Sequence, residues 1–381
     1  MGKKRKVKKR FSALSLLVLI LSFGIVFFGN PIVAGAKIKL SFGKLNSELV
    51  ESISTNPSID YDRSVIFASS PQGIVKCEQN SFILYDPSGQ AVWEKEINAP
   101  STMVRFGESF IIIGDYGTGE IYNLSLNGEI NGSAQGFGKL KDIRVGENGV
   151  IAVVLAQDSE VVLMNEKLEE ITRISLPKGE LMDFDLSANK SLVAFSFINM
   201  DQSNFYSNVL LYSLDGRLIG ATNFEEQYIF GIKVIEDNIV GVLDNEIFVL
   251  NSDNELIQTT AIDRRIESFY LDEAGLVFLN LTKNPEDLTD TRPDNVIEIM
   301  SLDGKEAMPD IVIDTTVDQM VVNADYLTFL SGDKIYQLDK SSGELLKIQT
   351  LEKDALKLHT MDRTYFGVEY IDKFDIYSLD H

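Results

Sequence analysis

Short runs of apolar residues recur along the chain after about residue 60, and each run ends in a polar turn. Within one stretch the pattern predicts strands at residues 140–145, 150–156, 160–164 and 171–176. The wholly apolar run at 150–155 is typical of a strand that is covered on both faces. No long helical period follows residue 36. The pattern therefore predicts an all-β fold.

The strands are separated by turns that resemble one another and recur at intervals of about 42 residues, the period of four-stranded propeller blades. The turns are Asp86-Pro87-Ser88-Gly89, Leu126-Asn127-Gly128-Glu129, Asn165-Glu166-Lys167-Leu168, Leu214-Asp215-Gly216-Arg217, Asn251-Ser252-Asp253-Asn254, Leu302-Asp303-Gly304-Lys305 and Asp339-Lys340-Ser341-Ser342-Gly343. A further strand at residues 374–380 ends the chain where the next turn would follow.

Seven complete units and an incomplete last one predict a β-propeller of eight four-stranded blades. We expect the missing strand of the last blade to come from the N-terminal side, with residues 37–45 as the best candidate, because closure from both ends removes an exposed sheet edge. A seven-bladed ring, in which the first unit merges with the closing blade, is the alternative.

The N-terminus has the pattern of a membrane anchor. Residues 1–10 contain seven of the 35 Lys and Arg and no acid, and residues 11–36 carry no charge. The apolar residues 11–28 span roughly 27 Å as a helix, close to the thickness of the hydrocarbon layer. Because positive residues stay inside, we expect a cytoplasmic tail at 1–10, an anchor at 11–36 and an extracytoplasmic propeller at 37–381.

A second interpretation of this segment stays open. Ala34-Gly35-Ala36 matches the cleavage site of a secretory signal, so the alternative is a protein that is secreted after cleavage behind Ala36. Both interpretations export the rest of the chain.

Charge and composition exclude several classes of partner and site. Residues 37–381 keep 28 bases against 57 acids, a net charge of −29. We expect no nucleic-acid partner, because phosphate binding needs a basic surface. Cys77 is the only cysteine, and His359 and His381 are the only histidines, so we expect no disulfide, no metal site and no cofactor.

The stretch from Leu84 to Trp93, with Asp86 and Gly89 in its turn, resembles the repeat of quinoprotein-type (PQQ-like) propellers. Residues 336–346 are a weaker copy of this repeat. The overall layout resembles an uncharacterised family of membrane-anchored propellers from Gram-positive anaerobes. The resemblance implies the fold more than the activity, because some relatives are quinone-dependent dehydrogenases and others are cofactor-free envelope scaffolds.

The chain departs from the quinone enzymes in its site residues. Those enzymes use paired cysteines, calcium-binding carboxylates and many tryptophans, whereas this chain has one cysteine and one tryptophan, Trp93. We expect Trp93 to pack between blades and His359 to be structural. Gly114-Asp115-Tyr116-Gly117-Thr118-Gly119 is predicted to be a hairpin turn, because it lacks the lysine and the helix of a phosphate loop.

Two inserts are the candidate partner-contact loops. One is an acidic segment with Asp287, Asp290, Arg292 and Asp294, and the other, at residues 199–208, carries Phe205 and Tyr206. Long loops on rigid scaffolds tend to carry function. For the two aromatic residues the alternative is that they pack on their own blade.

We therefore predict a membrane-anchored, extracytoplasmic scaffold that binds a cell-envelope protein or glycan, and not an enzyme. The alternative is a carbohydrate-active enzyme of the cell envelope that uses two carboxylates in the central channel.

Overall fold

The computed structural model describes residues 38–40, 55–60 and 65–378, except residues 158, 189–191, 202–203, 237, 285–290, 292, 314, 324 and 362–364. Residues 38–381 belong to one compact unit. The predicted anchor, residues 11–36, lies outside the described residues. Within the described ranges, no helix is long and apolar enough to cross a membrane.

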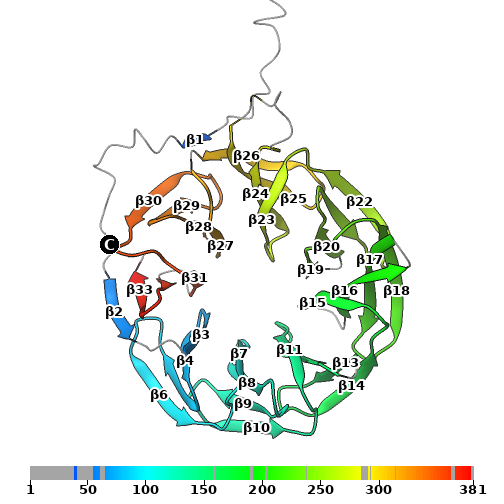
Figure 1. Ribbon diagram of the computed structural model, residues 1–381, viewed down its shortest axis with the longest axis vertical. Coiled ribbons are helices and arrows are strands. Elements are labelled where there is room, and N and C mark those ends of the chain that lie inside the picture. Colours follow the sequence, from blue (N-terminus) through cyan, green and yellow to red (C-terminus); the bar gives the residue numbers. More distant parts are fainter. Residues whose placement is uncertain are drawn as a thin grey trace, which may run out of the picture. The chain divides into compact units, whose positions relative to one another are not determined.

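In the described part of the chain, eight blades of four strands each, one of them with an added fifth strand, are arranged in a ring around a central channel, as the turn period predicted (Figure 1). The first four blades consist of β3 (Val65–Ser70), β4 (Gly73–Glu78), β5 (Ser81–Tyr85) and β6 (Ala91–Glu96); β7 (Thr102–Phe106), β8 (Phe110–Asp115), β9 (Ile121–Ser125) and β10 (Ile130–Ala134); β11 (Leu140–Val145), β12 (Ile151–Leu155), β13 (Glu160–Met164) and β14 (Glu170–Ser175); β15 (Glu180–Leu186), β16 (Leu192–Asp201), β17 (Asn204–Ser213) and β18 (Leu218–Glu225).

The last four blades complete the ring and include both ends of the described chain. They consist of β19 (Gly231–Ile235), β20 (Asn238–Val242), β21 (Glu246–Leu250) and β22 (Leu256–Ala261); β23 (Arg265–Leu271), β24 (Leu276–Thr282), β25 (Asn295–Ser301) and β26 (Glu306–Ile313); β27 (Gln319–Val322), β28 (Tyr326–Ser331), β29 (Lys334–Asp339) and β30 (Leu345–Thr350); β31 (Lys357–Thr360), β32 (Tyr365–Glu369), β33 (Lys373–Ser378) and β2 (Thr55–Asp60).

The strand that closes the ring is not the one that the sequence suggested. β2 supplies the outer strand of the eighth blade, pairing antiparallel with β33, so the closing strand does come from the N-terminal side. The predicted segment 37–45 instead contributes β1 (Ile38–Leu40), which pairs parallel with β26 in the sixth blade. The prediction of residues 37–45 was wrong because only β2 ends close enough to β3 to form a short outer-to-inner link, like the links between the other blades.

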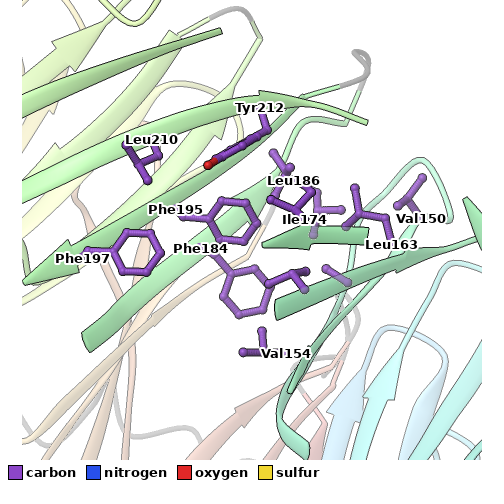
Figure 2. Packing of buried hydrophobic residues seen from close by; sticks show 13 residues of the cluster. Val150, Val154, Leu163, Ile174, Phe184, Leu186, Phe195, Phe197, Leu210 and Tyr212 are labelled. Atoms are coloured by element: carbon purple, nitrogen blue, oxygen red, sulfur yellow. The ribbon is translucent and has the colours of Figure 1, made fainter. Parts of the chain in front are cut away.

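The hydrophobic core is divided among the blade interfaces. Eight clusters of buried residues are found among the described residues, and each joins two neighbouring blades. Figure 2 shows the cluster between the third and fourth blades, where Phe184 and Phe195 have ring centroids 6.0 Å apart. Burying an aromatic side chain of this size contributes roughly 1.5–3 kcal/mol. Blade-to-blade packing therefore holds the ring together.

Hydrogen bonds add specific links between blades. The Trp93 indole N–H donates to the Leu126 carbonyl of the next blade over 3.0 Å, which confirms that Trp93 lies between blades. Gly128 follows in the same turn with φ near +80°, and a Cβ there would meet the Trp93 ring at 2.9 Å. The conformation and the close contact both require glycine at this position.

The glycine-rich segment around Asp115 is a hairpin turn, as predicted. It connects β8 and β9, and the Asp115 carboxylate accepts hydrogen bonds from the backbone N–H groups of Gly117 and Thr118 at 2.8 and 2.7 Å. Burial alone would raise the pKa of Asp115, but hydrogen bonds from Ser101, Thr118 and Gly117 lower it below its usual value. The carboxylate therefore stabilises the turn as an acceptor.

Candidate protein-binding surface

Strand direction determines which connections share a face of the ring. In four antiparallel strands, the connection between the second and third strands opens on the same face as the links between blades. The turns between the other strands open on the opposite face. We call the first the insert face, because it carries the β16–β17 and β24–β25 connections, and the second the turn face.

Contacts between blades agree with this division. Arg264, in the link from β22 to β23, donates hydrogen bonds to the carbonyls of Pro293 and Asp294 just before β25. On the turn face, Lys340 from the β29–β30 turn reaches Asp272 in the β23–β24 turn at 2.8 Å. The described ends of the two connections that contain the inserts therefore lie on the same face of the propeller.

The hairpin of the fourth blade is longer than its counterparts. β16 and β17 have ten residues each. The second and third strands of the other blades have five to seven. At about 3.3 Å per residue, three to five extra residues carry the tip roughly 10–16 Å further along the strand direction. The end of this hairpin therefore extends beyond those of the neighbouring blades on the insert face.

Apolar side chains gather at this tip. Met200 is 80% exposed and lies directly opposite Phe205 in the strand register. The Phe205 ring stacks on Tyr228, with ring centroids 4.3 Å apart. Phe230 is 56% exposed and is separated from Tyr228 by the buried Ile229, so both aromatic side chains point away from the core. We call Met200, Phe205, Tyr228 and Phe230 the hairpin patch.

The structure thus gives the predicted aromatic residues different surroundings. Phe205 belongs to the hairpin patch and contacts Tyr228 in the link to the next blade. Tyr206 lies opposite Asn199 and Glu225 and is half-buried on its own blade. Sequence reasoning missed Met200, Tyr228 and Phe230. For the last two a signal exists in the run Tyr228-Ile229-Phe230, directly before β19, where two aromatic residues flank one aliphatic residue.

The acidic insert is described only at its ends. The Asp294 side chain is 81% exposed and its carboxylate lies 2.8 Å from the Lys283 ammonium. Asp287, Asp290 and Arg292 lie outside the described residues. Among the residues that the structure describes, no group of three or more His, Cys, Asp or Glu side chains is placed to hold a metal ion.

His359 lies beside the central channel, where the last blade meets the first. Its Nδ1 lies 3.2 Å from the Ser69 hydroxyl of β3, and its Nε2 lies 2.9 Å from a Glu369 carboxylate oxygen of β32. Burial lowers the pKa of His359, so the neutral imidazole is favoured despite the nearby carboxylate. This residue ties the closing blade to β3, in agreement with the structural role expected for it.

Carboxylates do line the channel at the turn face. Glu147, Asp185 and Glu273 border a cavity of about 280 Å³ together with Lys233. A hydrogen bond with Glu273 and burial raise the pKa of Glu147 to about 7, while the same hydrogen bond lowers the pKa of Glu273. The Lys233 ammonium lies 3.3 Å from Glu273. The two glutamates are hydrogen-bonded to each other at the channel mouth, and the Lys233 ammonium pairs with one of them, Glu273.

Comparison with known proteins places the chain in a family. Residues 48–371 match the family described as "Family of unknown function (DUF5711)", and the chain belongs to it. A comparison with curated proteins gave no match in sequence.

Solved structures of other β-propellers are similar in fold. Sqt1 from Saccharomyces cerevisiae has a TM-score of 0.62 at 10% identity, over 87% of this chain and 100% of that one. The computationally designed Ika8 protein has a TM-score of 0.60 at 10% identity, over 86% and 100%. BamB from Moraxella catarrhalis has a TM-score of 0.56 at 9% identity, over 86% and 100%. These likenesses show the β-propeller fold.

Proposed function

We propose that this protein is a binding scaffold, anchored in the membrane by residues 11–28, that recruits a protein partner outside the cytoplasm through its insert face. The hairpin patch carries the proposal. Single exposed apolar residues are ordinary on a protein surface, but several large apolar side chains at a projecting hairpin and in the link that follows its blade are typical of an interaction site. Large aromatic and methionine side chains are also enriched in protein interfaces.

The scaffold suits this role because the blades are packed rigidly and the tip is presented away from them. Phe195 and Phe197 are fully buried at the base of the same hairpin, so its direction is set by the core. A rigid site loses little conformational entropy when a partner binds. Protein is the favoured partner over a cell-envelope glycan, because the patch offers mainly apolar surface.

The proposed location rests on the charge pattern of the N-terminus. Seven basic residues precede an uncharged segment that is long enough to span the hydrocarbon layer. Fusion of a phosphatase that is active only outside the cytoplasm tests it. We expect activity when the enzyme follows His381 of the full chain and loss of that activity on deletion of residues 11–28, whereas an inactive full-chain fusion would contradict the proposed location.

A comparison of matched surface variants tests the binding role. The tagged full chain is recovered from its native membranes, and its co-purifying proteins are quantified for wild type and for Met200→Ser/Phe230→Ser. The control is Leu356→Ser/Ile371→Ser, which alters residues that are 60% and 59% exposed on the same face of the eighth blade. We expect the patch variant alone to lose a partner, about tenfold or more, as for removal of a binding hot spot. Equal recovery by both variants would refute the proposed surface.

A further inference from the structure

The outer strand of the fourth blade has an open edge. β18 pairs with β17 on one side and is the last strand in the order of its sheet. It has eight residues, whereas the outer strands β6, β10, β14, β22 and β30 have five or six. Among the described residues, no backbone group from 218 to 225 has a backbone partner outside this sheet. β18 therefore offers a longer free edge than those five outer strands.

The register shows which backbone groups face outward. The Glu226 N–H donates to the Phe205 carbonyl over 3.1 Å, so these two residues form a hydrogen-bonded pair. Because such pairs alternate along an antiparallel ladder, Phe224, Thr222 and Gly220 also face β17. Ala221, Asn223 and Glu225 then present their N–H and C=O groups to the open edge.

The residues of β18 do not protect this edge. Proteins usually shield outer strands with charged residues or proline, and β6, β14, β30 and β2 each contain at least one. Residues 218–224 contain neither, and the last residue of β18, Glu225, is its one charged residue. The shorter outer strands β10 and β22 also lack both, so β18 differs from these two in its length. The edge also runs towards the hairpin patch, because Glu225 lies opposite Tyr206 and Glu226 bonds to Phe205.

The same propeller already accepts an added strand elsewhere. β26 is the other outer strand of eight residues, and β1 pairs with it in parallel, from Ile38 opposite Ile311 to Leu40 opposite Ile313. The sixth blade thereby has five strands. An outer edge of this length can thus bind an extended segment through main-chain hydrogen bonds, which is a common way of recognising peptides.

Charge indicates what kind of segment fits. Glu225 and Glu226 are exposed where β18 meets the hairpin patch, and residues 37–381 carry a net charge of −29. A second copy of this chain would be repelled, whereas a basic segment would be attracted. We propose that β18 binds an extended, positively charged segment of the partner as a fifth strand of the fourth blade. This inference rests on the proposed function and specifies how its partner is held.

Hydrogen exchange with defined peptides tests the proposal. The probes are two soluble decapeptides in which valine alternates with lysine in one and with glutamate in the other, each added to the full chain. At a peptide concentration ten times the dissociation constant, bound amides should exchange about tenfold more slowly. We expect this protection in residues 218–225 with the lysine peptide only. Equal protection by the glutamate peptide, or equal protection of β22, would overturn the proposal.

Proline variants separate edge binding from other contacts. Ala221→Pro removes an outward N–H and spares the bonds to β17, so it should abolish the protection. The matched control is Thr259→Pro on β22, where the Ile262 N–H bonded to the Asn245 carbonyl shows that Thr259 also faces outward. Asn223→Lys keeps the backbone intact and should weaken binding of the lysine peptide through charge repulsion alone. Unchanged peptide binding by both Ala221→Pro and Asn223→Lys would refute the added strand.

The two hypotheses fail in different ways. If the peptides never protect β18 but Met200→Ser/Phe230→Ser still loses the natural partner, the added strand is wrong and the scaffold function stands. If that variant also retains every partner, the proposed function itself is wrong.

Discussion

The ion pair between Lys340 and Asp272 should be one of the most sensitive electrostatic links of the ring. The two side chains join the sixth and seventh blades over 2.8 Å and are only 12% and 11% exposed. Asp272→Asn leaves the ammonium buried, with the Asn323 carbonyl at 3.3 Å as its remaining acceptor. Removing one partner from a buried pair costs about 3–5 kcal/mol, because the other charge is left uncompensated.

This cost translates into a measurable shift of the melting temperature. An unfolding entropy of about 2.1 cal/mol/K per residue over roughly 340 residues gives about 0.7 kcal/mol/K. The expected decrease is therefore about 4–7 °C, measured by calorimetry on the full chain at neutral pH. Lys340→Met should produce a decrease of similar size, since it leaves the carboxylate unpaired.

A double-mutant cycle distinguishes the pair from simple loss of packing. Asp272→Asn/Lys340→Met removes both charges with the same two substitutions and should be less destabilising than either single variant. Lys305→Met is the control, because Lys305 pairs with Asp303 on the surface with both side chains largely exposed, and it should leave the melting temperature unchanged. Single shifts below about 2 °C, or strictly additive effects, would refute the reasoning.

Three further outcomes are expected from thermal unfolding. Phe195→Ala should destabilise the protein by about 3–5 kcal/mol, because the fully buried ring leaves a cavity between two blades. Burial lowers the pKa of His359 in the folded protein, so the unfolded chain binds the proton more readily. Acidification below pH 6.5 should therefore lower the stability in part through His359, and His359→Gln should reduce this pH dependence. Glu298 acts in the opposite direction: burial raises its pKa to about 7, so its contribution to stability is lost as the pH rises through 7, and Glu298→Gln should stabilise the protein at pH 8. After discounting for solvent screening, that gain should be about 1–2 kcal/mol, and no gain at pH 8 would contradict the assigned cause.

The blade repeat could be predicted because every unit has the same local physics. Residues 151–155 are apolar at every position since β12 is covered by blades on both faces, and the predicted strand 150–156 differs from it by one residue at each end. Turns such as Asp86–Gln90 are fixed locally, with the Asp86 carboxylate accepting from the Gln90 N–H at 2.9 Å. Local periodicity and turn chemistry were sufficient for the ring and its blade count.

Long-range pairing was harder to predict. β1 and β2 are both short segments before the first complete blade, and nothing in their own residues states which sheet each joins. The choice depends on the partner edge and on the length of the link to β3, which are tertiary properties. The sequence therefore indicated closure from the N-terminal side but not the correct strand.

The binding surface was predicted in part. Phe205 was recognised as an unusual aromatic residue in an insert, but its contact with Tyr228 joins residues 23 positions apart across two blades. Met200 alone carries no signal in the sequence, because an isolated methionine is usually a core residue. Its 80% exposure is a consequence of the hairpin length, which only the pairing of β16 with β17 establishes.

Site-specific photocrosslinking in living cells tests the central claim most directly. A photoreactive phenylalanine analogue replaces Phe230 in the hairpin patch or, as the control, Ile371 on the same face of the eighth blade, sites that are 56% and 59% exposed. The account predicts a discrete crosslinked protein from position 230 that is absent from position 371 and disappears with Met200→Ser. The same adducts from both positions, or none from either, would contradict it.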